Sequence, residues 1–148
     1  MIRATLTALF ILCVAATANA FDPEKVAGVE AGVADCPDCD FTGANLQFQC
    51  VKTGDLSRAR FDDANLKYAC MRETTLHDTS FRNADLTGAN LSDADLAGAD
   101  MTGAILSLTL IRGTDLSGAL HLTQDQIARA CGDARTKLPP GLSIHICE

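Results

Sequence analysis

The stretch NADLTGANLSDADLAGADM, residues 83–101, carries a large apolar residue at every fifth position. An α-helix repeats about every 3.6 residues and a β-strand every second residue, so neither buries an apolar series of this spacing on one face. The series extends in both directions to sixteen members and stops at His121, and a small residue stands two positions before nearly every member, with Gln49 as the main exception. The sixteen members are Phe41, Leu46, Val51, Leu56, Phe61, Leu66, Met71, Leu76, Phe81, Leu86, Leu91, Leu96, Met101, Leu106, Ile111 and Leu116.

An internal repeat of this length indicates a solenoid. The units ADLTG, ANLSD, ADLAG and ADMTG match the pattern A-[DN]-L-x-x, and residues 39–118 therefore resemble the pentapeptide repeat family. The resemblance implies an all-β fold, a right-handed quadrilateral β-helix of about four coils with four units in each coil. Residues twenty apart then share a column, which stacks Phe41, Phe61 and Phe81.

Residues 1–20 have the features of a secretory signal peptide. Arg3 lies near the start, an apolar run covers residues 6–16, and the segment ends in Ala-Asn-Ala, so we expect cleavage after Ala20. An uncleaved membrane anchor is the alternative, which the shortness of the apolar run disfavours. No later segment is apolar enough to span a membrane. The sequence thus predicts a periplasmic or secreted protein.

Charge and motifs narrow the classes of function. The full chain has a formal net charge of −7, and loss of Arg3 with the signal leaves 11 basic against 19 acidic residues, a net charge of −8. Such an acidic surface disfavours nucleic acid as a direct partner. No Ser-His-Asp spacing, metal-ligand set or phosphate-binding loop stands out, so we predict no enzyme activity, no cofactor and no metal site.

Both ends of the repeat carry sequences of a different kind, which we interpret as caps because an open β-helix end exposes unpaired backbone. Asp22 is a candidate N-cap for a short N-terminal helix, and residues 123–126 form a capping box for a helix that should run to about Ala130 and end at Gly132. The segment LTQDQIARACGDARTKLPPGL resembles the closing module of many exported pentapeptide repeat proteins. The predicted segments are a signal peptide (1–20), an N-terminal capping helix and lead-in (21–38), the β-helix (39–120) and a C-terminal cap helix with a disulfide-tied tail (121–148).

An even number of cysteines in an exported chain indicates disulfides. Cys50 and Cys70 are twenty residues apart, so the coil model places their Cα atoms about 4.8 Å apart, within the range of a disulfide, and we predict that they are bonded. Cys131 and Cys147 flank the tail and are expected to tie it to the cap helix. The six cysteines of the mature chain are Cys36, Cys39, Cys50, Cys70, Cys131 and Cys147.

The motif Cys36-Pro37-Asp38-Cys39 has two interpretations. A C-x-x-C pair can be a redox centre, but no βαβ pattern surrounds this one. The favoured interpretation is a local disulfide or turn at the start of the solenoid. A zinc site is disfavoured because no histidine of the mature chain has ligand spacing to the pair.

One outward column departs from the polar norm of the repeat. The column holds Phe48, Tyr68, Gly88 and Leu108, and Ile105 and Leu110 stand nearby at positions that should face water. An exposed apolar patch usually marks a contact. We favour coverage of this column by the tail or the N-terminal helix, and the alternative is a contact surface for a partner protein or for a homodimer.

The first hypothesis for function is a non-catalytic exported binding or scaffold protein, whose partner is an unknown protein or envelope component. The resemblance implies one alternative, because some pentapeptide repeat proteins resemble B-form DNA in shape and charge and bind type II topoisomerases. A redox protein that uses Cys36 and Cys39 is the second alternative. The sequence leaves open whether the protein is a monomer or a homodimer.

Overall fold

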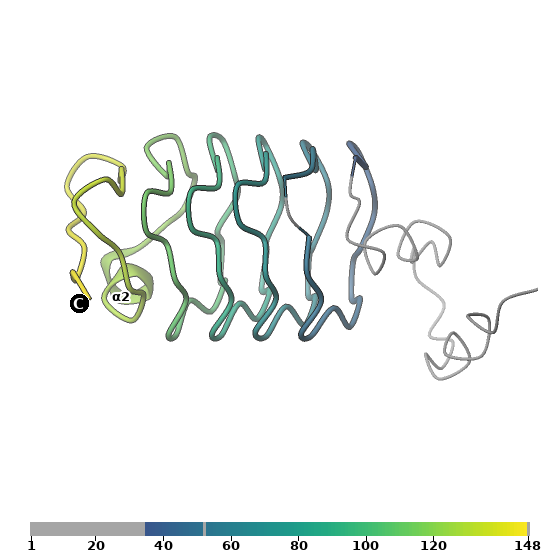
Figure 1. Ribbon diagram of the computed structural model, residues 1–148, viewed down its shortest axis with the longest axis horizontal. Helices are drawn as coiled ribbons and strands as arrows, with labels where there is room; N and C mark the ends of the chain where they lie inside the picture. The colour runs from purple at the N-terminus through teal and green to yellow at the C-terminus, as the bar shows by residue number, and fades with distance from the viewer. Residues whose placement is uncertain (1–34, 52, 148) are drawn as a thin grey trace, which may run out of the picture.

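The computed structural model describes residues 35–51 and 53–147. Over this part of the chain the backbone winds into a β-helix whose coils stack along one axis (Figure 1). Helix α2, Gln124–Ile127, lies at the C-terminal end of the stack (Figure 1). The predicted signal peptide, residues 1–20, and the helix predicted to begin at Asp22 lie outside the described residues.

Backbone hydrogen bonds between successive coils hold the stack together. Parallel single-residue bridges join positions twenty apart, and one wall runs from Asp40 to Arg60 and on to Ser80. In the second of these bridges Phe61 N donates to Ser80 O over 2.7 Å, and Ser80 N donates to Ala59 O over 3.0 Å. The predicted twenty-residue period is therefore confirmed, and it corresponds to four five-residue units per coil.

A tight turn follows each central apolar residue. In the first complete unit, Ala44 N donates to Phe41 O over 2.9 Å, and Gly43, the third residue of the turn, has a φ of 68°. A positive φ at the third residue defines a type II turn. Gly, Asn and Asp tolerate this left-handed region best, which explains why they recur two positions after the central residue.

The central apolar residues fill the axis of the β-helix. All sixteen are at most 3% exposed. The predicted phenylalanine column is confirmed: the ring centroids of Phe41 and Phe61 are 4.9 Å apart, those of Phe61 and Phe81 are 5.3 Å apart, and both pairs are stacked. The core is thus a set of continuous side-chain columns, and each coil depends on its neighbours for burial.

Buried threonines occupy the small inward position in four units. Thr109 Oγ1 donates to Leu86 O over 2.8 Å, and Thr114 Oγ1 donates to Leu91 O over 2.7 Å. A hydroxyl is tolerated in the core because its hydrogen bond goes to a backbone carbonyl of the preceding coil. The four buried residues are Thr74, Thr79, Thr109 and Thr114.

Helix α2 begins with the predicted capping box, in which Thr123 Oγ1 accepts from Gln126 N and Gln126 Oε1 accepts from Thr123 N. The predicted end at about Ala130 is wrong, because α2 ends at Ile127. The reason lies in the last coil of the β-helix, because Leu108 N of that coil donates a backbone hydrogen bond of 2.8 Å to Arg129 O. Ladder bonding to the last coil thus replaces further helical bonding.

The chain after α2 rejoins the ladder with a shifted register. Leu110 bridges to Cys131 and Asp115 bridges to Lys137, so the spacing changes from twenty residues to 21 and then 22. Cys131 and Cys147 are joined by a disulfide with their Cα atoms 5.5 Å apart. The tail therefore covers the end of the stack, as expected for a cap.

Side chains of the cap satisfy carbonyl groups of the last coil. Gln126 Nε2 donates to Met101 O over 2.8 Å, and Thr136 Oγ1 donates to Ile111 O over 2.8 Å. These carbonyls belong to central residues, the same class that the buried threonines bond within the stack. The cap thus supplies donors that a further coil would otherwise provide.

Asp133 and Asp115 fasten the tail through charged hydrogen bonds. Asp133 Oδ1 accepts from Gly113 N over 2.8 Å, and Lys137 Nζ donates to Asp115 Oδ2 over 2.8 Å. Desolvation raises the pKa of Asp133, but hydrogen bonds from Gly113 and Arg135 outweigh it and lower the pKa to about 2. The Lys137 bond and hydrogen bonds from Ser117 lower the pKa of Asp115 to about 2 as well.

The aromatic column predicts a contrast between two phenylalanines. Phe61→Ala should lower the free energy of unfolding by about 3–5 kcal/mol, because it opens a cavity in the core. Phe48→Ala, the matched control on the surface, should change it by less than about 1 kcal/mol, because Phe48 is 66% exposed. Urea denaturation followed by circular dichroism measures both, and equal losses would contradict the column arrangement.

The tail carboxylates predict a loss of stability in acid. Their folded pKa lies below the ordinary value of 3.8, so their contribution is present above pH 4 and is lost as the pH falls towards 2. Asp133→Asn should therefore make stability fall less steeply over this range. Denaturant titrations at stepwise pH values measure the slope, and identical slopes in wild type and Asp133→Asn would show that Asp133 contributes nothing.

Candidate interaction surface

One corner of the β-helix carries an exposed column of apolar side chains. Phe48 is 66% exposed, Tyr68 is 50% exposed and Leu108 is 70% exposed. The rings of Phe48 and Tyr68 are stacked, with centroids 5.3 Å apart and planes 7° apart. The Tyr68 ring lies over Gly88, where an added Cβ would come within 2.5 Å of it. We call Phe48, Tyr68, Gly88 and Leu108 the apolar stripe.

The predicted neighbours of the apolar stripe lie on its two sides. Ile105 is 45% exposed, and Leu110 is partly buried beneath the cap strand to which it bridges. The five apolar side chains singled out from the sequence thus gather along one corner. Lys67 and Asp85 form an ion pair of 3.1 Å beside the stripe.

The backbone conformation of the stripe is unfavourable for its residue types. Phe48, Tyr68 and Leu108 have φ values of 63°, 57° and 60°. A left-handed residue other than glycine costs roughly 1–2 kcal/mol, and Asp and Asn bear it better than large apolar residues. No other corner column in the described residues carries a large apolar side chain at this turn position. One of these columns holds Asp38, Arg58, Asp78 and Gly98, the second holds Gly43, Asp63, Asn83 and Gly103, and the third holds Thr53, Glu73, Asp93 and Gly113.

The stripe is not covered by the C-terminal cap. The favoured expectation was that the tail or the N-terminal helix folds over it, but the tail lies across the end of the stack and leaves Leu108, the nearest member, 70% exposed. The tail must lie there because its backbone satisfies the open ladder of the last coil. The expectation that the tail covers the stripe is therefore wrong. The N-terminal helix lies outside the described residues, so coverage by it stays a prediction.

The disulfide predicted between Cys50 and Cys70 is absent from the structure, although the two residues bridge each other in adjacent coils as expected. Parallel side chains in one column keep a separation near the coil spacing of about 4.8 Å. A disulfide brings the two Cβ atoms to about 3.8 Å. A stacked register therefore brings cysteines close together without giving them bonding geometry.

Cys36 and Cys39 form a disulfide, with their Cα atoms 5.6 Å apart. Cys39 N donates to Cys36 O over 3.3 Å, which is the same turn bond that closes most of the repeat units. Cys36 stands five residues before Phe41 and Cys39 five before Ala44, so the pair fills the central and the small inward positions of an additional unit. This spacing was visible in the sequence, and it explains the C-x-x-C motif by the repeat.

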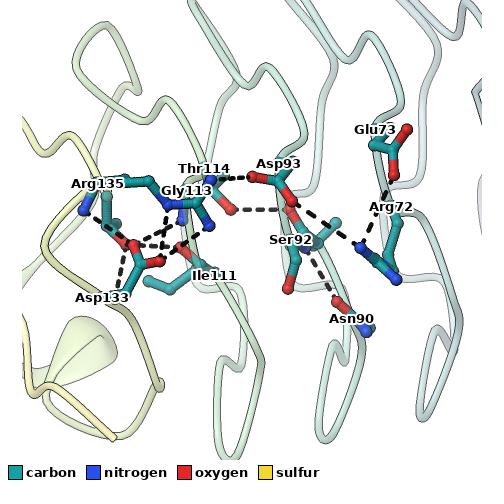
Figure 2. A network of polar contacts seen from close by, with 12 residues as sticks. Arg72, Glu73, Asn90, Ser92, Asp93, Ile111, Gly113, Thr114, Asp133 and Arg135 are labelled. Carbon is teal, nitrogen blue, oxygen red and sulfur yellow. Dashed lines mark hydrogen bonds and ion pairs between the residues drawn. The ribbon is translucent and has the colours of Figure 1, made fainter.

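The corner that carries Asp93 holds charges of both signs. Figure 2 shows Asp93 between two arginines, with Arg135 Nη1 2.9 Å and Arg72 Nη2 4.0 Å from its carboxylate oxygens. On another wall His77 Nε2 lies 2.6 Å from Asp95 Oδ2, and this hydrogen bond raises the pKa of His77. The pairing leaves rows of mixed charge on the surface.

Within residues 35–51 and 53–147 no group of three or more His, Cys, Asp or Glu side chains is placed to hold a metal ion. The same residues include no helix with the length and apolar character needed to cross a membrane.

A β-helix of five-residue units with a polar surface and one apolar corner defines a solenoid repeat protein. Comparison with known families matches residues 39–78 and 79–118 to pentapeptide repeats, in 8 copies. The chain therefore belongs to the pentapeptide repeat family and is a right-handed β-helix.

Several solved structures resemble this chain. A pentapeptide repeat protein from Nostoc PCC 7120 is 27% identical with a TM-score of 0.50, over 78% of this chain and 93% of that protein. One from the Arabidopsis thaliana thylakoid lumen is 30% identical with a TM-score of 0.41, over 76% of this chain, which spans 62% of that protein's length. Rfr23 from the cyanobacterium Cyanothece 51142 is 24% identical with a TM-score of 0.44, over 78% of this chain and 97% of that protein. Comparison with curated proteins gives no match.

The left-handed conformation of Leu108 predicts an unusual order of stability. Leu108→Gly should be more stable than Leu108→Ala by about 1 kcal/mol, because glycine adopts a φ of 60° without steric cost and alanine does not. Both variants remove the exposed side chain, so the comparison isolates the backbone. Thermal and urea unfolding measure the difference, and a more stable alanine variant would show that the turn imposes no such cost.

Proposed function

We propose that this protein is a non-catalytic exported binding or scaffold module that contacts another protein or an envelope component through the apolar stripe. The observation that carries the proposal is the exposed column of Phe48, Tyr68 and Leu108 on one corner of the β-helix, whose coils are joined by backbone bridges. Apolar side chains gathered on the surface of a soluble protein usually mark a contact.

The backbone supports a functional origin of the stripe. Glycine, Asp or Asn would relieve the turn at each of its three bulky positions, as they do at most turn positions of the other corners. Strained positions that persist against an easy remedy are typical of functional sites. Aromatic residues are also enriched in the contacts that contribute most to protein association.

Export is part of the proposal. Residues 1–20 have the composition of a secretory signal. Two disulfides, Cys36–Cys39 and Cys131–Cys147, hold the start of the β-helix and its tail, and such bonds persist in oxidising compartments. We therefore assign the mature chain to the periplasm or the cell exterior.

The charge pattern argues against the alternative of a DNA mimic that binds a topoisomerase. A surface that imitates DNA requires regularly spaced, unpaired negative charge. Here Asp93, Asp100 and Asp115 each lie within 4.0 Å of an arginine or lysine nitrogen. The acidic rows are thus neutralised at intervals along the β-helix.

The position of Cys36 and Cys39 argues against the redox alternative. Cys39 is 2% exposed, and Cys36 packs against the core. A redox-active cysteine needs access for its substrate thiol. The pair is better suited to closing the first turn than to exchanging electrons.

A photo-crosslinking experiment tests the proposed contact. A benzophenone amino acid that replaces Phe48 should yield a discrete adduct when the protein is irradiated in the cell envelope, because the stripe is the binding surface. The same group at Asp63, which holds the equivalent turn position on another corner, is the matched control. Adducts of equal yield at both positions, or none at Phe48, would refute the proposal.

A further inference from the structure

We propose that the partner of the apolar stripe is a second copy of this chain, packed antiparallel so that the two stripes face each other. This inference rests on the proposed binding role of the stripe and names its partner. The two-fold axis crosses the stripe midway between the coils of Tyr68 and Gly88, and the axes of the two β-helices run in opposite directions.

The order of residues in the stripe allows it to pack against its own reverse with apolar groups along its whole length. From the N-terminal coil upward the stripe reads Phe48, Tyr68, Gly88 and Leu108, at intervals of one coil or about 4.8 Å. In the antiparallel arrangement Phe48 of each copy faces Leu108 of the other, and the coil of Tyr68 faces the coil of Gly88. Because each Tyr68 ring already lies over Gly88 of its own copy, the two rings meet at the two-fold axis, and each end is apolar against apolar. A parallel arrangement would instead set Lys67 against Lys67 of the other copy.

The charges beside the stripe fit the same arrangement. Lys67 lies one residue before Tyr68, and Asp85 lies in the next coil on the same side, 3.1 Å from Lys67 Nζ. The two-fold axis exchanges these two coils, so each Lys67 faces the coil that carries Asp85 in the other copy. The interface then contains two equivalent sets of opposite charges, because a two-fold axis repeats each contact.

The competing occupant within the described part of the chain is the C-terminal tail, and it is already committed elsewhere. Lys137 O accepts from Leu116 N over 2.8 Å, and Cys131 O accepts from Ile111 N over 2.8 Å, so the tail is bonded to the end of the stack. The stripe spans three coil intervals, about 14 Å, which is less than the width of a standard interface. We therefore expect a reversible dimer.

Charge reversal across the axis tests the inference directly. Sedimentation velocity of the purified mature protein should show a shift from monomer to dimer as the concentration rises. Lys67→Glu and Asp85→Lys should each weaken self-association at least tenfold, because each places like charges opposite one another twice per dimer. An equimolar mixture of the two variants should recover association, because each contact then pairs opposite charges.

Loss in each single variant together with recovery on mixing is the pattern that the antiparallel contact predicts, because a parallel contact would set Lys67 against Lys67 in the wild type and would not be weakened by Lys67→Glu. Leu108→Asp should also abolish the dimer while the chain remains folded, since Asp tolerates the left-handed turn at this position. Gly43→Asp is its matched control, because it adds the same charge at the same turn position of another corner, where an added Cβ meets nothing within 4 Å. This control should dimerise as the wild type does.

Three outcomes overturn the inference: a monomer at every concentration, association that survives Leu108→Asp, or variants that do not recover on mixing. The mass of the photo-crosslinked adduct formed at position 48 distinguishes failure of the dimer proposal from failure of the proposed binding function. An adduct of twice the chain mass supports the second copy. An adduct of another mass, from a protein that sediments as a monomer, overturns the dimer and leaves the binding role intact.

Discussion

Hydrogen bonds between backbone groups twenty residues apart determine where every side chain of this β-helix points. Because Ser80 bonds to the coil of Arg60, and Arg60 to that of Asp40, one residue type repeated along a column produces one continuous feature. In the interior that feature is the stack of phenylalanine rings, and on the surface it is a row of a single chemistry. The same twenty-residue register therefore sets the columns of the core and those of the surface, and a change of register would alter both together.

The turn that closes each unit explains why the apolar stripe is informative. The fold requires a left-handed residue there, and most corners meet the requirement with glycine or a short polar residue. The stripe meets it with Phe48, Tyr68 and Leu108, which gain nothing from the turn and are exposed to water. Two independent terms, backbone strain and hydration, thus oppose these residues in the isolated chain. A contact that buries them offsets the hydration term.

The repeat could be predicted from the sequence because its spacing is incompatible with ordinary helices and strands, and burial of all sixteen central residues follows from that spacing. The length of α2 could not be predicted from the sequence, because the last coil bonds to the backbone of Arg129 in place of further helical bonding. No local sequence pattern indicates this competition. The pairing of Cys50 with Cys70 was inferred from column height alone, whereas a disulfide also depends on the direction of the two Cβ atoms. The exposure of the stripe could not be predicted either, because it depends on where the tail docks, and that is decided by the contacts at the C-terminal end of the folded stack.

The change of spacing from twenty residues to 21 and 22 in the tail also determines how this protein can vary in length. An insertion of one whole coil upstream would extend the rod and present the same closing edge to the cap. An insertion of five, ten or fifteen residues would keep the interior filled but turn the cap onto a different wall, where Gln126 and Thr136 no longer meet their carbonyls. Duplication can therefore lengthen such a chain only by complete coils.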